Sequence, residues 1–324
     1  MSRPHAELHS VLAIAIKAFL QYKRALGCKY QTEAATLHLL DAYVVDQRAM
    51  TWERIDSGLI DGFLASRPRS HARSYNHLVG VIHRFFKWAV TQRMINHNPV
   101  TARPRRVTGQ RIPYLFSLGD ARRLLDVARS LPTRPKAPHR ALVYETVFAL
   151  LYGLGLRVGE VTRLLVGDVQ FDRATLLIRD TKFNKSRLVP FGPQMGERLT
   201  RYVEQQFGGH GDPQAPLFSF TKRGAIHECT ISLAFHSLVP RLGLHIPAGV
   251  AHPRLHDLRH AFAVGTLVRW YQEGVDPNRR LIQLSTFLGH TDPASTSVYL
   301  TITEELLRQA DLRFRAFAPR RGQS

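Results

Sequence analysis

Apolar residues in the first hundred positions recur at helical spacing in four separate stretches. The pattern predicts helices over about residues 6–26, 31–47, 57–66 and 70–94. The core face of the last helix is predicted to consist of Leu78, Ile82, Phe85, Phe86 and Ala89. Basic residues fall on another side of it, namely Arg73, His77, Arg84 and Lys87. A stripe of this kind is either a solvated helix face or a surface that contacts a polyanion.

The helical spacing stops at residues 101–113, where prolines, a glycine and several arginines take its place. This composition is typical of a linker between domains. Its basic side chains are Arg103, Arg105, Arg106 and Arg111. The chain is therefore predicted to comprise a helical domain over residues 1–100, a basic linker over 101–113 and a second domain over 114–324.

The second domain is predicted to start with a helix capped near Ser117, followed by a buried helix from about Leu142 to Tyr152. In the string L-L-I-R-D-T-K-F-N-K-S-R-L-V-P-F, two β-prone runs flank a polar tip, so a small antiparallel sheet is predicted near residues 175–190. Further helices follow. The fold class is thus mainly α with a small antiparallel β-sheet (α+β).

Charge and cysteine content narrow the function classes. The 324 residues carry a formal net charge of +20, so a polyanion is the natural partner, although a ribosomal or membrane-surface protein can be equally basic. The only two cysteines, Cys28 and Cys229, argue against a disulfide framework and suit a reducing cytoplasm. Lys17 interrupts the one apolar stretch near the start, so no signal peptide, membrane span or membrane partner is expected.

Six residues of the second domain suit the cleavage of a phosphodiester. Tyr299 is the candidate nucleophile, because a tyrosine hydroxyl can stay bonded to the phosphate as a covalent catalyst. A phenol with a pKa of about 10 needs a base and positive charge nearby, and His256 with two arginines can provide them. The planar forks of Arg157 and Arg259 would clamp two phosphate oxygens. This clamp makes a metal or other cofactor unnecessary.

Two further residues complete the set. The departing 5′ oxygen is a poor leaving group unless it is protonated, and Lys182 can act as that general acid. His290 would hydrogen-bond the phosphate or position the tyrosine. Other interpretations stay open for single residues: Arg157 as a surface arginine, Tyr299 as a packing residue, and His252, His256 and His260 as metal ligands.

The order of Arg157, Lys182, L-H-D-L-R-H-A-F (255–262), L-G-H-T-D and V-Y-L resembles the tyrosine recombinases (phage-integrase family). This family carries its catalytic lysine on a hairpin before an N-K-x-R-L-V-P stretch, which implies that Lys182 is the catalytic lysine and that Lys185 is a DNA-backbone contact or a solvated turn residue. The G-L-R-x-x-E pattern implies that Glu160 supports the site. Asp257 and His260 are assigned the same supporting role.

The resemblance also implies what the chain does and what it binds. The front half would be the core-binding domain that clamps double-stranded DNA with the catalytic half, with the linker arginines on phosphates. The enzyme would be a site-specific recombinase that cleaves and rejoins DNA through a 3′-phosphotyrosyl intermediate, in the cytoplasm and associated with the nucleoid. The strings W-Y-x-x-G-x-D and L-S-T-x-L-G-H look like those of transposon-encoded recombinases and favour a mobile-element enzyme.

The apolar stripe of residues 304–317 predicts a C-terminal helix. In the family such a helix packs into the neighbouring protomer, which implies a homotetramer on paired sites or an assembly with related recombinases. Three alternatives remain: a chromosome-dimer-type resolvase, a type IB topoisomerase, which relaxes supercoils as a monomer, and a non-catalytic DNA-binding regulator.

Overall fold

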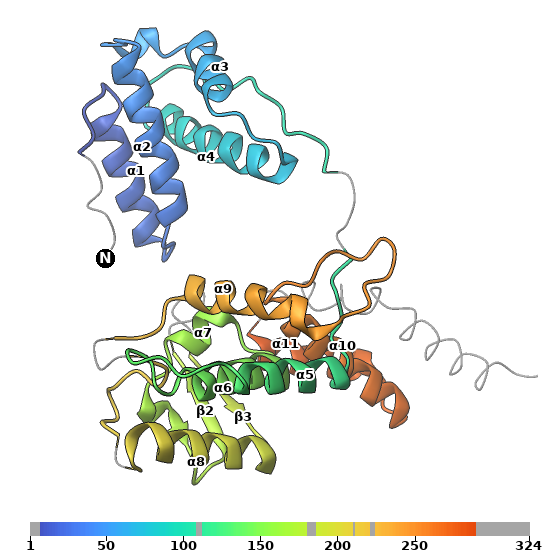
Figure 1. Ribbon diagram of the computed structural model, residues 1–324. Coiled ribbons are helices and arrows are strands. Elements are labelled where there is room, and N and C mark those ends of the chain that lie inside the picture. Colours follow the sequence, from blue (N-terminus) through green and yellow to red (C-terminus); the bar gives the residue numbers. More distant parts are fainter. Residues whose placement is uncertain (1–6, 108–111, 180–185, 210, 221–223, 290–324) are drawn as a thin grey trace, which may run out of the picture. The chain divides into compact units, whose positions relative to one another are not determined.

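The computed structural model describes residues 7–107, 112–179, 186–209, 211–220 and 224–289, without the side chains of 277–279. The chain divides into two compact units, Met1–Gln110 and Arg111–Ser324. The described parts are mainly helical with one small antiparallel sheet, which confirms the predicted fold class (Figure 1). No helix of the described residues is long and apolar enough to cross a membrane.

The N-terminal unit is built from four α-helices, as the apolar spacing predicts. They are α1 (Ala13–Ala25), α2 (Gln31–Asp46), α3 (Ser57–Ser66) and α4 (Ala72–Thr91), with a short 3-10 helix at Trp52–Arg54 (Figure 1). The core face predicted for α4 is confirmed, since Leu78, Ile82, Phe85, Phe86 and Ala89 are all buried. Phe85 packs edge-on against Phe19 of α1, which joins the two helices in one core.

The start of the first helix was predicted wrongly, because residues 7–12 do not belong to α1. Their backbone is held by the buried carboxylate of Asp41 in α2 instead. The amides of His9 and Ser10 donate to its two oxygens at 2.9 and 3.0 Å. These bonds satisfy backbone donors that a helix would leave unpaired in its first turn. A contact across 31 and 32 positions leaves no trace in local spacing.

The beginning of the predicted linker lies along the N-terminal unit. Arg105 and Asn76 of α4 exchange two hydrogen bonds between the Arg105 backbone and the Asn76 amide group, at 2.7 and 2.8 Å. The Arg105 guanidinium stacks on the ring of Tyr75 and donates to the carbonyl of Arg69. Residues near 105 therefore extend the surface of α4.

The C-terminal unit packs helices around a central buried helix. Its helices are α5 (Leu118–Arg129), α6 (Arg140–Gly153), α7 (Val158–Thr162), α8 (Pro193–Phe207), α9 (Glu228–Leu238), α10 (Asp257–Gln272) and α11 (Pro277–Leu288), with 3-10 turns at Val166–Asp168 and Val239–Leu242. The helix α5 starts where it was predicted, at a capping box in which Ser117 and Asp120 bond each other's backbone amides. Nine consecutive residues of α6 are buried, so this helix forms the centre of the core.

The small sheet consists of β1 (Val169–Gln170), β2 (Thr175–Ile178) and β3 (Arg187–Pro190), in the order β1-β2-β3. The predicted antiparallel pairing of β2 and β3 is confirmed. Leu176 faces Val189, and Ile178 faces Arg187. Since side chains alternate along a strand, Arg187 belongs to the face on which Val189 is buried. An arginine on this face requires an acceptor inside the protein.

Candidate active site

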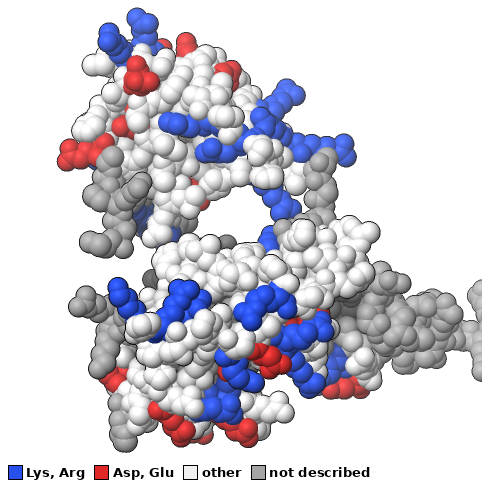
Figure 2. Space-filling view, viewed as in Figure 1, with Lys and Arg blue, Asp and Glu red and all other residues white. Residues whose placement is uncertain are grey.

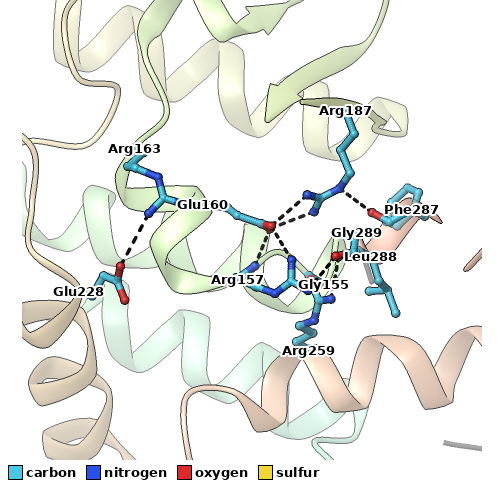
Figure 3. A network of polar contacts seen from close by, with 10 residues as sticks. All are labelled: Gly155, Arg157, Glu160, Arg163, Arg187, Glu228, Arg259, Phe287, Leu288 and Gly289. Carbon is cyan, nitrogen blue, oxygen red and sulfur yellow. Dashed lines mark hydrogen bonds and ion pairs between the residues drawn. The ribbon is translucent and has the colours of Figure 1, made fainter. Parts of the chain in front are cut away.

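Arg157 stands at the N-cap of the short helix α7, at the turn that follows α6. Its side chain has two partners. Nη1 donates to Oε1 of Glu160 at 2.8 Å, and Nη2 donates to the carbonyl of Gly289 at 2.9 Å (Figure 3). The Arg157 amide also bonds Oε2 of Glu160, which caps the helix. The side chain keeps 35% of its surface exposed, so a ligand can reach it.

Glu160 is buried and is shared by two arginines. Arg187 of β3 grips both of its oxygens, with Nη1–Oε1 and Nη2–Oε2 distances of 2.9 Å. Burial alone would raise the pKa of Glu160, but the hydrogen bonds and charges of Arg187 and Arg157 lower it to about 2. Glu160 is thus a carboxylate at any physiological pH. It links α7 to the sheet.

Arg259 lies in the first turn of α10 and is almost completely buried, at 1% exposure. Its Nη1 donates to the carbonyl of Gly155 at 2.6 Å, and its Nη2 donates to the carbonyl of Leu288 at 2.7 Å. Gly155 has a positive φ of 59°, and a Cβ there would lie 2.5 Å from the ring of Phe262. The turn that precedes Arg157 in the sequence therefore requires a glycine, and the carbonyl of this glycine accepts from Arg259.

The last carbonyls of α11 bring the three arginines together. Phe287, Leu288 and Gly289 accept from Arg187, Arg259 and Arg157 respectively, at 2.9, 2.7 and 2.9 Å (Figure 3). Carbonyls at a helix C-terminus lack partners in the helix and carry partial negative charge, so cations are favoured there. The turn after α6, strand β3, helix α10 and the end of α11 consequently meet at one place, immediately before His290.

Two histidines of α10 lie beside this cluster. The rings of His256 and His260 contact each other edge-on, with their centroids 4.7 Å apart. Partial desolvation, repulsion from a protonated His260 ring and the positive charge of Arg259 lower the pKa of His256 to about 4, although the residue is exposed. Burial and the charges of Arg254 and Arg259 lower the pKa of His260 to about 4 as well. Both rings are neutral near pH 7.

Asp257 lies between these residues and supports the start of α10. It is completely buried, and its Oδ2 accepts from the backbone amide of Arg254 at 2.8 Å. Its Oδ1 faces the Arg254 guanidinium at 3.6 Å. The carboxylate thereby fixes the turn that carries His256.

The structure brings together Arg157, Glu160, His256, Asp257, Arg259 and His260 out of the residues predicted for the site. Lys182, Lys185, His290, Tyr299 and Arg111 lie outside the described residues, as does the predicted C-terminal helix. Within the described ranges, no group of three or more His, Cys, Asp and Glu side chains is placed to hold a metal ion.

Arg187 is part of the cluster, and sequence reasoning did not assign it a role. The string S-R-L-V-P predicts a strand and part of a motif, but neither prediction gives the arginine within it a function. Strand alternation could have found it, because a charged residue in register with the buried Val189 points toward the core and must be neutralised there.

The basic residues predicted on α4 form an exposed surface. Arg73, His77, Arg84 and Lys87 are all exposed, and Arg84 donates from Nε to the Tyr30 hydroxyl at 3.3 Å. A hollow beside them is lined by Tyr22, Lys23 and Trp88 as well as by Arg84 and Lys87. Figure 2 shows Lys and Arg side chains gathered over one part of the N-terminal unit. Of the linker arginines, Arg103, Arg105 and Arg106 are also exposed.

Comparison with known proteins identifies the family. A model of the phage integrase family matches residues 119–305, which is more than half of the chain. The chain belongs to the phage integrase family. It is accordingly a tyrosine-type site-specific DNA recombinase, and the resemblance seen in the sequence is confirmed.

Individual relatives extend the match over both units. The integrase/recombinase y4rB of Sinorhizobium fredii is 34% identical over 317 residues, which cover 91% of this chain and 94% of the relative. The tyrosine recombinase XerD of Ralstonia nicotianae is 30% identical over 261 residues, covering 78% and 77%. The structure of the Tn1549 transposon integrase in complex with transposon right end DNA has the same fold, with a TM-score of 0.63 at 14% identity, covering 94% of this chain and 99% of that one.

Proposed function

We propose that this chain cleaves and rejoins the two strands of a specific DNA site through a 3′-phosphotyrosyl intermediate, in the service of a mobile genetic element. The observation that carries the proposal is the meeting of Arg157 and Arg259 at the end of α11, next to His256 and directly before His290. Two guanidinium groups held together in this way form a site for a phosphodiester.

In the proposed reaction, the Tyr299 hydroxyl attacks the phosphorus of the scissile phosphodiester. His256, whose ring is neutral at pH 7, accepts the phenol proton. Arg157 and Arg259 stabilise the charge that develops on the non-bridging oxygens. The bond between phosphorus and the 5′ oxygen breaks, Lys182 donates a proton to that oxygen, and the 3′ phosphate stays bonded to the tyrosine.

Rejoining reverses these steps with a 5′ hydroxyl from the partner strand. That hydroxyl attacks the phosphotyrosine, Lys182 takes its proton back, and the phenol leaves with the proton from His256. The bond energy stays in the phosphotyrosine throughout, so the reaction requires no cofactor. His290 contributes a hydrogen bond to the phosphate or to the tyrosine.

We further propose that both units bind double-stranded DNA and that the N-terminal unit is the core-binding domain. The net charge of +20 and the exposed basic surface of α4, with Arg73, Arg84 and Lys87, support this proposal. Arg103, Arg106 and Arg111 of the linker and Lys185 of the hairpin are proposed to contact phosphates in the same way. The Arg105 guanidinium is engaged with Tyr75 and Arg69, so it holds the linker on the surface.

The active assembly is proposed to be a tetramer on two paired sites, formed with identical or related recombinases. An apolar groove of about 320 Å³ in the C-terminal unit supports this, since it can receive a helix from a neighbouring subunit. It is lined between α10 and α11 by Phe262, Trp270, Leu284 and Phe287, with Leu154 at its side.

The mobile-element role rests on the strings W-Y-x-x-G-x-D and L-S-T-x-L-G-H. The 30% identity with XerD favours a Xer-type recombinase as the second candidate. The first role would be supported if the DNA flanking the gene carried inverted repeats that the protein recombines. Activity on a chromosomal site alone would support the second.

Trapping of the covalent intermediate tests the proposal. A duplex nicked close to the cleavage site loses its 5′ end after cleavage, so the protein stays attached to the 3′ phosphate. Wild-type protein is expected to give an adduct that survives denaturing electrophoresis. Tyr299→Phe should give none while it binds the duplex within about threefold of wild type, because one hydroxyl contributes little to an affinity set by phosphate contacts. Adduct formation by Tyr299→Phe would disprove the assignment.

A further inference from the structure

We infer that Arg187 is a positioning residue for strand cleavage, which keeps the Arg157 guanidinium available to the scissile phosphate. The inference rests on the proposed function, in which Arg157 binds that phosphate. Arg187 acts through two groups that both arginines contact, the Glu160 carboxylate and the backbone at the end of α11 (Figure 3).

The guanidinium of Arg187 is engaged with the protein more fully than that of Arg157. All three guanidinium nitrogens donate to protein acceptors at 2.9 Å: Nη1 and Nη2 to Glu160, and Nε to the carbonyl of Phe287. Its side chain is 12% exposed, against 35% for Arg157. Arg187 would have to give up the buried Glu160 before it could reach a ligand, whereas Arg157 already has an open surface.

Glu160 needs Arg187 if Arg157 is to bind anything else. Its Oε1 accepts from both arginines, and its Oε2 accepts from Nη2 of Arg187 and from the Arg157 amide. Without Arg187, the Arg157 side chain would be the only guanidinium left on a buried carboxylate. An anion that is short of donors in a low-dielectric site attracts the remaining cation strongly. Glu160 would then compete with the phosphate for Arg157.

The backbone of Gly289 forms the second link. A Cβ at this position would lie 2.6 Å from Nη1 of Arg187, so the guanidinium lies flat against the main chain where only glycine leaves room. The φ of 67° also favours glycine. Since the carbonyl of the same residue accepts from Arg157, a shift of Arg187 would move the acceptor that orients Arg157.

The variant Arg187→Gln tests the inference, with Arg198→Gln as its matched control. Arg198 of α8 bonds the buried Glu145 of α6, and Glu145 has Arg129 as its second arginine. The control thus removes one of two arginines from a buried carboxylate in the same unit, in a cluster that contains none of the proposed catalytic residues.

Single-turnover cleavage is measured on two nicked duplexes that differ only at the scissile group. One carries the normal phosphodiester, and the other carries a methylphosphonate, in which a neutral methyl group replaces one charged oxygen. We expect Arg187→Gln to lower the cleavage rate on the phosphodiester about 10- to 100-fold, as is usual for residues that orient a catalytic group. The dissociation constant should stay within about threefold of wild type, because Arg187 makes no DNA contact.

The methylphosphonate distinguishes positioning of Arg157 from general damage to the fold. It has less charge to neutralise, so it depends less on Arg157. The deficit in cleavage rate of Arg187→Gln relative to wild type should therefore be at least about fivefold smaller on the methylphosphonate than on the phosphodiester. The deficit of Arg157→Ala should also be smaller on the methylphosphonate. Arg198→Gln should show no such deficit on either substrate.

Several results would overturn the inference. The first is a deficit of Arg187→Gln that is equal on both substrates, while the deficit of Arg157→Ala shrinks on the methylphosphonate. The second is a cleavage rate of Arg187→Gln within about twofold of wild type. The third is a deficit of Arg198→Gln equal to that of Arg187→Gln. If the deficit of Arg157→Ala does not shrink on the methylphosphonate, the proposed role of Arg157 is contradicted, and the inference about Arg187 falls with it. If Arg187→Gln does not fold, Arg187→Lys serves in its place, because it keeps the charge and loses the planar fork.

Discussion

The two units use arginine in different ways. On α4, Arg73, Arg84 and Lys87 are exposed side chains on a solvent-facing surface. In the C-terminal unit, Arg157, Arg187 and Arg259 donate to a buried carboxylate and to main-chain carbonyls. Exposed side chains adapt to a phosphate backbone but must be ordered when they bind it. Arginines that are already held in place lose little on binding and can stabilise a transition state, so the two sets suit affinity and catalysis respectively.

A substitution among the three arginines of the C-terminal unit should have the largest effect on strand cleavage. Arg259→Lys retains the charge, but a single ammonium cannot reach the carbonyls of Gly155 and Leu288 and also fork a phosphate. We expect the rate of strand cleavage to fall about 10²- to 10³-fold, the usual cost of one donor to a developing anion. Single-turnover trapping on a nicked duplex measures it.

The affinity of Arg259→Lys for DNA shows whether this arginine serves catalysis rather than binding. Its affinity for the duplex in a gel shift should stay within about fivefold of wild type, because most phosphate contacts are proposed to lie elsewhere. A loss of affinity as large as the loss of cleavage rate would show that Arg259 serves binding and catalysis alike. The contrast between the units would then be wrong.

Removal of the exposed basic side chains of α4 should have a smaller effect, which is confined to DNA binding. With Arg73, Arg84 and Lys87 all replaced by alanine, we expect the dissociation constant to rise about 10- to 100-fold. The slope of log K against log salt should fall by about 0.9 for each phosphate that the variant no longer neutralises. Cleavage at saturating protein should stay near the wild-type rate. Titrations at several salt concentrations measure the slope, and an unchanged slope would mean that α4 has a merely solvated face.

The third prediction concerns pH and is the smallest. Burial and neighbouring arginines lower the pKa of His260 to about 4, whereas an unfolded histidine titrates at about 6.5. Between these values the unfolded chain holds more protons, so the free energy of unfolding must fall as the pH drops through this window. His256 contributes in the same direction.

Thermal unfolding of the DNA-free protein at pH 7.5 and pH 5 measures this effect. His260→Gln should reduce the loss of Tm on acidification by about 2–4 °C, the shift expected for roughly 1 kcal/mol in a unit of this size. The exposed His83 of α4, replaced in the same way, is the control. An equal pH dependence in wild type and His260→Gln would show that the histidine pair is not the cause.

Local spacing was sufficient to predict most of the fold. Helix α4 has an unbroken 3.6-residue period and a capping box marks the start of α5, so both were found close to their observed bounds. Spacing of three residues also related Glu160 to Arg157 correctly, because a helix N-terminus brings these positions together. The start of α1 was missed because a carboxylate from another helix determines it.

The candidate site was predictable only in its residue types. The sequence indicated Arg157 and Arg259 as a pair, but the acceptors that bring the two side chains together are main-chain carbonyls, which any sequence would offer equally. Nothing local shows that the last turn of α11 provides them. For Arg187, strand alternation indicates an inward side chain but not its partners, which lie 27 and 100 positions away.

The charges of the arginine cluster do not balance, and this connects DNA binding to stability. Arg157 and Arg187 share a single carboxylate, Glu160, and Arg259 donates to main-chain carbonyls next to them, so these four side chains carry an excess of positive charge. In the DNA-free protein that excess amounts to self-repulsion, which folding must overcome. A bound anion relieves it, so a phosphate or sulfate that binds at this site stabilises the native state by an amount that grows with the logarithm of its concentration. The DNA substrate should therefore raise the Tm of the C-terminal unit, even when its scissile phosphate cannot be cleaved.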